Sequence, residues 1–196
     1  MSDRKKTKEE FLSGKQRYRG PNRVVFLVFL IVAVVGVGWF AFMARDSAQL
    51  PKRYEGGNYN IGETPQYKGQ TISMTDITSE VKDGKIVIPL DKIIESNIIY
   101  TQYNAGGEAK AITAFITPSG HLSANMAMCE PCRSERFHIQ DNVLVCDTCG
   151  TRWYLNDLNG ISGGCVKYPP EDLPYEVKDG QVLIPADIVE EWQPRI

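Results

Sequence analysis

The sequence has few of the side chains that nucleophilic enzymes need. Only two of its 196 residues are histidine. No Ser/His/Asp arrangement, no glycine-rich loop suited to cradle phosphate and no pair of poised carboxylates is visible. Asp147 and Asp157 could line the rim of a site, but they form no such pair. These absences argue against an enzyme of the nucleophilic kind.

The chain also lacks a large excess of charge, because its formal net charge is only −2. This value hides an asymmetry. Residues 1–23 hold eight basic and three acidic groups, whereas the rest holds 14 basic and 21 acidic groups. A basic tail beside an acidic domain suits a membrane surface on one side and either cationic ligands or plain solvation on the other. The distribution argues against binding to nucleic acid.

One long hydrophobic run is present, over residues 24–43, and its 20 residues carry no charge. At about 1.5 Å per residue, a helix of this length spans about 30 Å of hydrocarbon. A cleaved signal peptide would have a shorter apolar stretch and small residues where Phe42 and Asp46 stand. We therefore predict a retained transmembrane helix. Since eight basic residues precede it and only three follow closely, the N-terminus is expected in the cytoplasm.

The domain organisation follows from this run. Residues 1–23 are expected to form a basic cytoplasmic tail, and residues 24–43 a transmembrane helix. Residues 44–72, rich in Gly, Pro and polar groups, are expected to form a linker. Residues 73–196 then form one extracytoplasmic domain, since a second large domain does not fit. Short apolar strands separated by turn signals predict a mainly β fold, a small antiparallel β domain.

One internal repeat stands out within this domain. Residues 80–93 (EVKDGKIVIPLDKI) and 176–189 (EVKDGQVLIPADIV) align without gaps. Each copy reads as an Asp-Gly turn, an alternating strand, a proline that ends it and an aspartate placed to cap a short helical turn. We expect two similar edge elements that frame the domain.

All five cysteines lie between residues 129 and 165. The two C-x2-C pairs, Cys129/Cys132 and Cys146/Cys149, are separated by the hairpin sequence RFHIQDNVLV. This spacing is typical of paired metal knuckles, in which four thiolates complete a tetrahedron around zinc or iron. We therefore predict a ribbon-like four-cysteine metal subdomain, with Cys165 as an additional candidate.

Other interpretations of the cysteines stay open at this point. They could form disulfides outside the cytoplasm, or they could hold a purely structural zinc ion. Four neighbouring side chains are further candidate ligands that would suit copper or a mixed site: His121, His138, Met126 and Met128. The two methionines share one strand face, which favours a core position. The sequence does not name the metal, because four thiolates accept zinc, iron, an iron–sulfur cluster or copper(I).

The chain resembles the FtrD-like membrane iron–sulfur family between about residues 80 and 190. The segments that carry the resemblance are VKDGKIVIPLDKI, NIIYTQYNAGGEAKAITAFITPSGHLSANMAMCEPC and VLVCDTCGTRWYLNDLNGISGGCVKYPP. The resemblance implies a role in bacterial inner-membrane iron uptake, beside an inner-membrane permease, a periplasmic iron-binding protein and a cupredoxin-like oxidase. It also implies electron transfer through a cysteine-bound centre. Many members have a polytopic membrane portion, so a permease function here would lie in a partner.

A weaker likeness concerns CDTCGTRWYLNDLNG and the Gly- and Pro-bearing loop that follows it. These residues resemble the second half of a Rieske cluster-binding unit, but cysteine replaces both histidines. An all-thiolate centre would have a lower potential than a Rieske centre.

The sequence predicts a membrane-anchored metal-binding protein. The resemblance implies iron or an iron–sulfur cluster as its cofactor, for electron transfer or metal handling in iron uptake. It is expected to be an electron carrier or a metal-binding subunit more than a stand-alone enzyme. The alternative is a structural zinc-ribbon adaptor that docks a membrane partner. A periplasmic thiol–disulfide or copper-handling protein is the third interpretation.

Overall fold

A computed structural model describes residues 22–46 and 50–196, without the side chains of residues 40–46 and 105. The chain divides into two compact units at the boundary between Asp46 and Ser47. Almost all of the predicted basic tail lies outside the described residues. Each unit is described below by itself.

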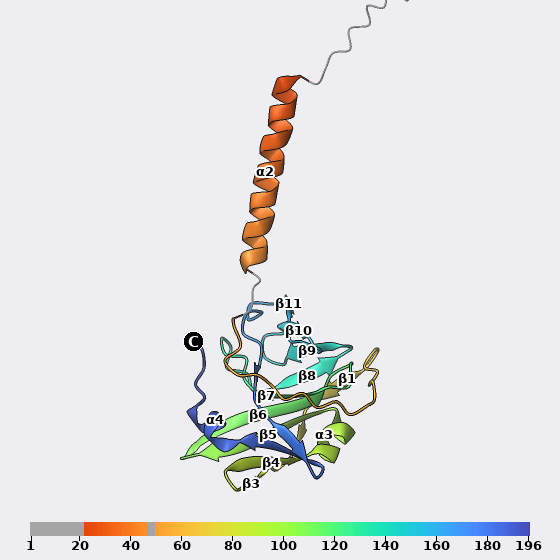
Figure 1. Cartoon of the computed structure of the whole chain (residues 1–196), viewed down its shortest axis with the longest axis vertical. Helices are drawn as coiled ribbons and strands as arrows, with labels where there is room; N and C mark the ends of the chain where they lie inside the picture. Colours follow the sequence, from red (N-terminus) through yellow and green to blue (C-terminus); the bar gives the residue numbers. More distant parts are fainter. Residues whose placement is uncertain (1–21, 47–49) are drawn as a thin grey trace, which may run out of the picture. The chain divides into compact units, whose positions relative to one another are not determined.

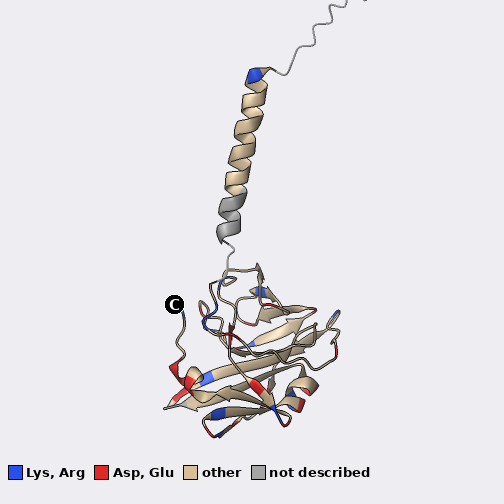
Figure 2. Cartoon of the chain, in the orientation of Figure 1, with Lys and Arg blue, Asp and Glu red and all other residues tan. Residues whose placement is uncertain are grey.

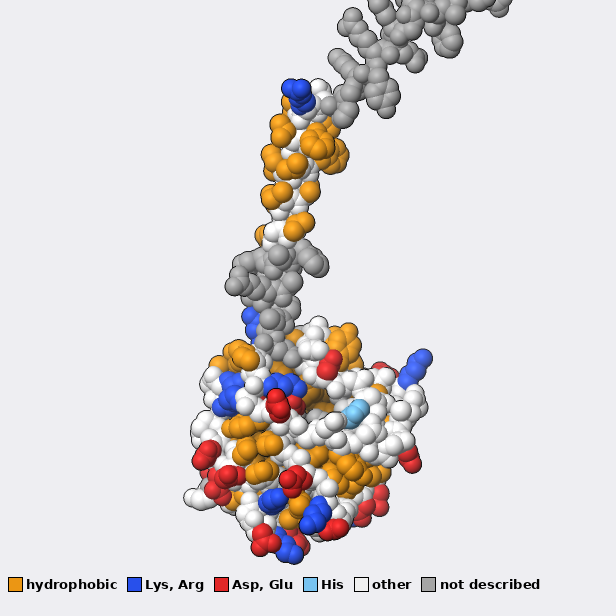
Figure 3. All heavy atoms as spheres, viewed as in Figure 1, with side chains coloured by type: hydrophobic (Ala, Val, Ile, Leu, Met, Phe, Trp, Pro, Cys, Tyr) orange, Lys and Arg blue, Asp and Glu red, His pale blue; other side chains and the backbone are white. Residues whose placement is uncertain are grey.

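The first unit contains one helix, α2 (Arg23–Asp46), which includes the whole predicted run of residues 24–43. In the part whose side chains are described, the only charge is that of Arg23 at the helix start (Figure 2). The large apolar side chains of this part of the helix are exposed (Figure 3). Among the described residues, no helix is both long and apolar enough to cross a membrane.

The second unit consists of three β-sheets and two short helices (Figure 1). The knuckle sheet has the order β1 (Thr71–Ser73), β8 (Phe137–Gln140), β9 (Val143–Cys146), β10 (Arg152–Tyr154), β11 (Gly160–Ser162). The central sheet has the order β12 (Glu171–Asp172), β7 (Leu122–Met126), β6 (Glu108–Ile116), β5 (Ile98–Ala105), β2 (Thr75–Asp76). The repeat sheet has the order β13 (Glu176–Lys178), β14 (Gln181–Pro185), β4 (Lys85–Pro89), β3 (Glu80–Lys82). The helices are α3 (Leu90–Ser96) and α4 (Ala186–Glu191). All strand pairs except β2 with β5 are antiparallel, which confirms the mainly β, antiparallel prediction.

The central sheet is the middle layer of the domain, because side chains on both of its faces are buried. Ile112 and Ala114 of β6 belong to a core shared with the repeat sheet, α3 and α4. Phe115, the residue after Ala114, points to the other face, as strand alternation requires. There it joins a second core that contains Phe137, Trp153 and three cysteines. The cysteine-bearing part of the chain is thus packed against a layer that is itself buried.

The two copies of the internal repeat pair with each other. Strands β4 and β14 are antiparallel neighbours at the centre of the repeat sheet, with Val87 opposite Leu183. Two reciprocal bonds reinforce the pair: Leu90 N–H donates to Gly180 O (3.0 Å) and Ala186 N–H to Gly84 O (2.9 Å). The sequence analysis expected two similar edge elements that frame the domain. The copies instead pair with each other and form one sheet. Two strands of the same alternating pattern present matching apolar faces, so they share one core when they pair.

The local chemistry of the repeat explains most of its shape. In each hairpin the Asp and Gly of the turn both have positive φ, 51° and 72° in the first copy and 50° and 72° in the second. These are the conformations that a two-residue Asp-Gly hairpin turn needs. Pro89 and Pro185 occupy the helix N-caps, without a side-chain capping bond. The aspartates expected to cap the helices, Asp91 and Asp187, lie two residues after these N-caps, in the first turn of each helix.

Residues 50–70, within the predicted linker, lie against the domain. The Tyr67 side chain is buried and its hydroxyl donates to Ile116 O (2.8 Å). Arg53 binds the buried carboxylate of Glu171 with its Nε (2.7 Å) and Nη2 (2.5 Å). The compact unit accordingly starts at Ser47, whereas the sequence analysis expected the domain from residue 73. The anchoring residues named here are one tyrosine and one arginine without periodic spacing, so no sequence pattern marks them.

The repeat sheet yields a test of its quasi-symmetry. Ile88 and Ile184 occupy equivalent positions and are both 0% exposed. Ile88→Ala and Ile184→Ala should each lower the free energy of unfolding by about 2–5 kcal/mol, because each leaves a cavity in the same core. Val81, 56% exposed on the edge strand, provides the control, and Val81→Ala should change it by less than about 0.5 kcal/mol. Urea denaturation of the detergent-solubilised full chain measures all three, and a mild effect at either isoleucine would contradict the shared core.

Candidate metal centre

The first knuckle follows strand β7. Cys129 N–H donates to Ser134 O (2.8 Å) and Cys132 N–H donates to Cys129 O (3.2 Å), which closes a tight turn around the first C-x2-C pair. Arg133, directly after the pair, has a φ of 58°. Its guanidinium donates to the backbone oxygen of Ile196, which lies 63 residues later in the sequence (2.9 Å). The first pair of cysteines is thus fixed both by its own turn and by the C-terminal residues.

The second knuckle follows strand β9 and has the same shape. Cys146 N–H donates to Thr151 O and Gly150 N–H donates to Cys146 O, both at 2.9 Å. Gly150 has a φ of 67°, which matches Arg133 in the first knuckle. Glycine adopts this left-handed conformation without strain, which suits the position directly after the second pair. Two similar turns therefore present four cysteines, as the spacing predicted.

A third loop brings Cys165 to the same place. Cys165 N–H donates to Thr151 Oγ1 (3.2 Å), and Trp153 Nε1 donates to Val166 O (3.1 Å). Gly163 lies so close to Thr151 that a Cβ at this position would meet its side chain at 2.5 Å. This close backbone approach holds the Cys165 loop against the segment that leads into strand β10.

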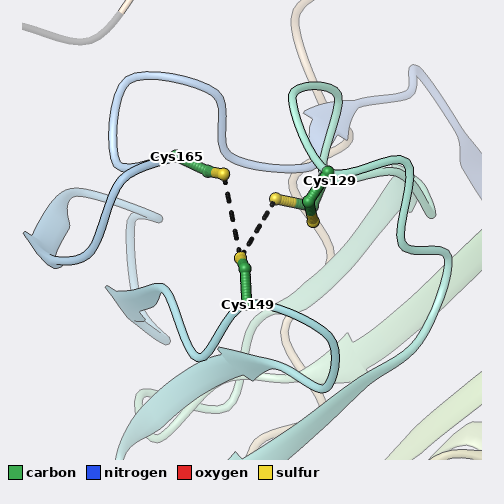
Figure 4. Close-up of side chains that lie close together, drawn as sticks. Cys129, Cys149 and Cys165 are labelled. Carbon is green, nitrogen blue, oxygen red and sulfur yellow. Dashed lines mark hydrogen bonds between the residues drawn. The ribbon is translucent and has the colours of Figure 1, made fainter.

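The sulfur atoms of these loops converge on one point (Figure 4). Cys149 Sγ lies 3.9 Å from Cys129 Sγ and 3.7 Å from Cys165 Sγ. Cys132 Sγ lies 3.6 Å from Cys146 Sγ. A tetrahedral metal with bonds to sulfur of about 2.3 Å requires sulfur–sulfur distances of about 3.8 Å. The separations between the loops already match those of a thiolate metal site, and all five cysteines are free thiols.

The grouping differs from the predicted ligand set in one member. The sulfurs of Cys129, Cys132, Cys149 and Cys165 all lie within 4.8 Å of one another. Cys146, a predicted ligand, adjoins this group through Cys132, whereas Cys165 was expected only as an additional participant. Sequence spacing singles out the two C-x2-C pairs. It does not predict how closely the later loop that contains Cys165 approaches them.

Charge is unevenly divided between the two knuckles. A hydrogen bond from Cys129, helped by the amides of Cys149 and Thr148, lowers the pKa of Cys146 to about 4. The same bond, together with burial, raises the pKa of Cys129 above its ordinary range. Burial raises the pKa of Cys132 to about 11. Burial also opposes ionisation of Cys149, but the hydrogen bonds of Thr151 outweigh it and its pKa lies below the ordinary value. Negative charge therefore collects on the second knuckle, and metal binding must release protons from the first.

The four further candidate ligands, two histidines and two methionines, make their contacts with residues other than the five cysteines. His121 is exposed, and its Nδ1 is near Ser119 Oγ (3.2 Å) and Asn60 Nδ2 (3.4 Å). His138 pairs through Nδ1 with the Asp147 carboxylate at 2.6 Å. Met126 is buried in the core between the central and repeat sheets, and Met128 packs against the same core. Among the described residues, the group that could hold a metal contains cysteine alone.

A buried ion pair that the sequence analysis missed holds the first knuckle in place. Glu130, the residue after Cys129, has a side chain only 1% exposed, and its Oε1 accepts a bond from Arg195 Nε at 2.5 Å. The guanidinium of Arg195 also donates to Pro169 O (2.8 Å), on the segment that follows Cys165. One arginine near the end of the chain thus joins the first knuckle to the third loop. No sequence signal marks it, because the partners lie 65 residues apart.

This pair generates a test. Arg195→Met should lower the free energy of unfolding by about 3–5 kcal/mol, because it leaves the Glu130 carboxylate buried without a counter-charge. Arg133→Met is the matched control, since that guanidinium is exposed and makes one bond to the chain end, and it should cost less than about 1 kcal/mol. Thermal unfolding of both variants measures the difference. Equal stability of the two variants would show that the ion pair does not hold the site.

The chemistry of the donor set fits a cysteine-bound iron centre. Iron–sulfur clusters and single tetrahedral iron ions are both held by four cysteine thiolates, and here five thiols from three loops meet. The separations of 3.6–3.9 Å suit a single ion in the present arrangement, and a cluster would require the knuckles to lie further apart. No histidine of the described residues joins the group, which excludes a Rieske-type ligand set within it.

Comparison with known proteins agrees with this site. No curated protein and no solved structure is significantly similar to the chain. The family model described as "Membrane iron-sulfur containing protein FtrD-like" matches residues 93–196, a range that contains both knuckles, Cys165 and Arg195. This match covers more than half of the chain and agrees with the resemblance carried by the cysteine motifs. The chain therefore belongs to the FtrD-like family of membrane iron–sulfur containing proteins.

Proposed function

We propose that this chain is a membrane-anchored electron carrier whose cysteine-bound iron centre serves an iron-uptake system. The observation that carries the proposal is the convergence of five free thiols in a chain of the FtrD-like membrane iron–sulfur family. A centre of this kind changes its charge by one electron without a change of ligands, which suits electron transfer.

In this proposal both knuckles hold the iron. Cys129, Cys132 and Cys149 belong to the compact thiol group, and Cys146 completes the four ligands that the C-x2-C spacing predicts. When bound, the iron supplies the redox change. The protein's own contribution is a fixed set of sulfurs, amide hydrogen bonds that stabilise the Cys146 thiolate, and a core that excludes water.

Access to this centre is one-sided. Cys129, Cys146 and Cys165 are buried, Cys132 is half-buried and Cys149 is exposed. The edge at Cys149 would therefore be the shortest path for an electron between the centre and a partner. The residues around Cys149, including Thr148 and Gly150, are exposed as well, so a partner could approach closely.

The proposal includes membrane attachment by residues 24–43. Helix α2 is continuous over this uncharged run, and the family description itself refers to membrane proteins. The basic excess before the run favours a cytoplasmic N-terminus and a periplasmic domain at the bacterial inner membrane. Partners would then be an inner-membrane permease and periplasmic iron-binding or redox proteins.

A structural zinc site is the second candidate function. The separations of 3.6–3.9 Å between sulfurs match a single tetrahedral ion, and zinc is the usual occupant of paired knuckles. In that case the chain would act as an adaptor that docks a membrane partner. A thiol–disulfide or copper-handling role has no separate observation in its favour.

Metal analysis of the full chain, purified without oxygen, separates the two candidates. The electron-transfer proposal predicts bound iron, colour in the visible range and bleaching on addition of a reductant. Assay of acid-labile sulfide then distinguishes a cluster from a single ion. One zinc per chain in a colourless and active protein would contradict the proposal, because zinc is redox-silent.

Proteolysis of spheroplasts tests the orientation. The charge distribution predicts that an added protease removes residues 47–196 and spares a tag attached before residue 23. Lysed spheroplasts serve as the control, since there both parts should be cut. Loss of the tag with survival of the cysteine domain would contradict the orientation.

A further inference from the structure

We propose that Cys146 and Cys165 are alternative fourth ligands of the metal centre, and that the site exchanges one for the other. This inference rests on the proposed function only in assuming that the thiol group binds a metal. It departs from the ligand set of the two knuckles, in which Cys165 has no place. Its basis is that five sulfurs meet at a site that takes four.

The distances place three cysteines in both sets. Cys129, Cys132 and Cys149 are common members, and Cys165 completes one group in which all sulfurs lie within 4.8 Å of one another. Cys146 Sγ lies 3.6 Å from Cys132 Sγ, and Cys165 Sγ lies 3.7 Å from Cys149 Sγ. Each of the two candidates is thus already at ligand spacing from a common member. A tetrahedral ion takes only four thiolates, so one of the two stays uncoordinated beside the filled site.

One buried residue fixes both candidates. Thr151 is 0% exposed, and its carbonyl accepts the Cys146 N–H (2.9 Å) while its Oγ1 accepts the Cys165 N–H (3.2 Å). The same hydroxyl lies 3.2 Å from the sulfur of the common ligand Cys149. In the proposed exchange the side chains of Cys146 and Cys165 rotate while this shared backbone anchor stays in place. The close approach of Gly163 to Thr151 holds the Cys165 loop at this distance.

The exchange is balanced in bonds and charge. A metal–sulfur bond to Cys165 forms as the bond to Cys146 breaks, and the proton of the Cys165 thiol passes to the released Cys146 thiolate. The total charge of the site does not change. An uncoordinated thiol next to the four-thiolate coordination shell can replace a departing ligand, so that water does not enter the metal site. This property suits a centre that must hand on or take up a metal as well as one that carries electrons.

Cobalt(II) substitution in the full chain tests the inference. The charge-transfer absorption of cobalt bound to thiolate grows with the number of thiolate ligands, so it counts them. Cys146→Ser and Cys165→Ser should each bind one cobalt per chain with the intensity of the wild type, because the remaining cysteine takes the fourth position. The double variant should lose about one quarter of that intensity, and Cys129→Ser, the control for a common ligand, should lose the same share.

Loss of intensity in only one of the two single variants would overturn the inference, since the fourth ligand would then be a fixed residue. Absence of cobalt, zinc and iron binding in the wild type would instead overturn the proposed metal site itself.

Discussion

A thiolate metal site requires sulfurs about 3.8 Å apart, and this chain must bring them there from three loops. Much of the domain serves that convergence. Thr151 fixes the second knuckle and the Cys165 loop together. Arg195 joins the first knuckle, through Glu130, to the segment after Cys165. Neither contact lies within a single loop, so the site exists only when the whole domain is folded.

The repeat sheet explains how a site of short loops is supported. Knuckles and hairpins contain little apolar surface of their own, and isolated hairpins are marginal in water. Here β6 is buried on both faces. Phe115 packs in the cysteine-bearing core, and Ile112 packs in the core between the central and repeat sheets. The paired repeat covers the core between the central and repeat sheets. After α4 the chain returns to Glu130, where Arg195 binds. The two copies therefore act as one platform.

The sequence predicted those features whose cause is local. The two C-x2-C knuckles follow from cysteine spacing, and the Asp-Gly turns follow from conformations that few residues adopt. Contacts between distant segments were missed. The pairing of the two repeats, the docking of residues 50–70 and the Glu130–Arg195 pair depend on which surfaces meet. Single residues such as Tyr67 or Arg195 carry no periodic signal.

The ligand set shows the same limit within the site itself. Spacing identifies four cysteines as a unit, but the approach of Cys165 depends on Gly163 and Thr151, which belong to different loops. Division of charge between the knuckles is likewise a tertiary property. The low pKa of Cys146 depends on Cys129, in the other knuckle.

X-ray absorption at the iron edge of the iron-loaded full chain tests the central claim most directly, which is that cysteine sulfurs from these loops are the only protein ligands of the iron. The account predicts a shell of four sulfurs at about 2.3 Å and no nitrogen or oxygen neighbour. A shell containing nitrogen or oxygen would contradict it, because among the described residues only cysteine lies in the group that could hold a metal.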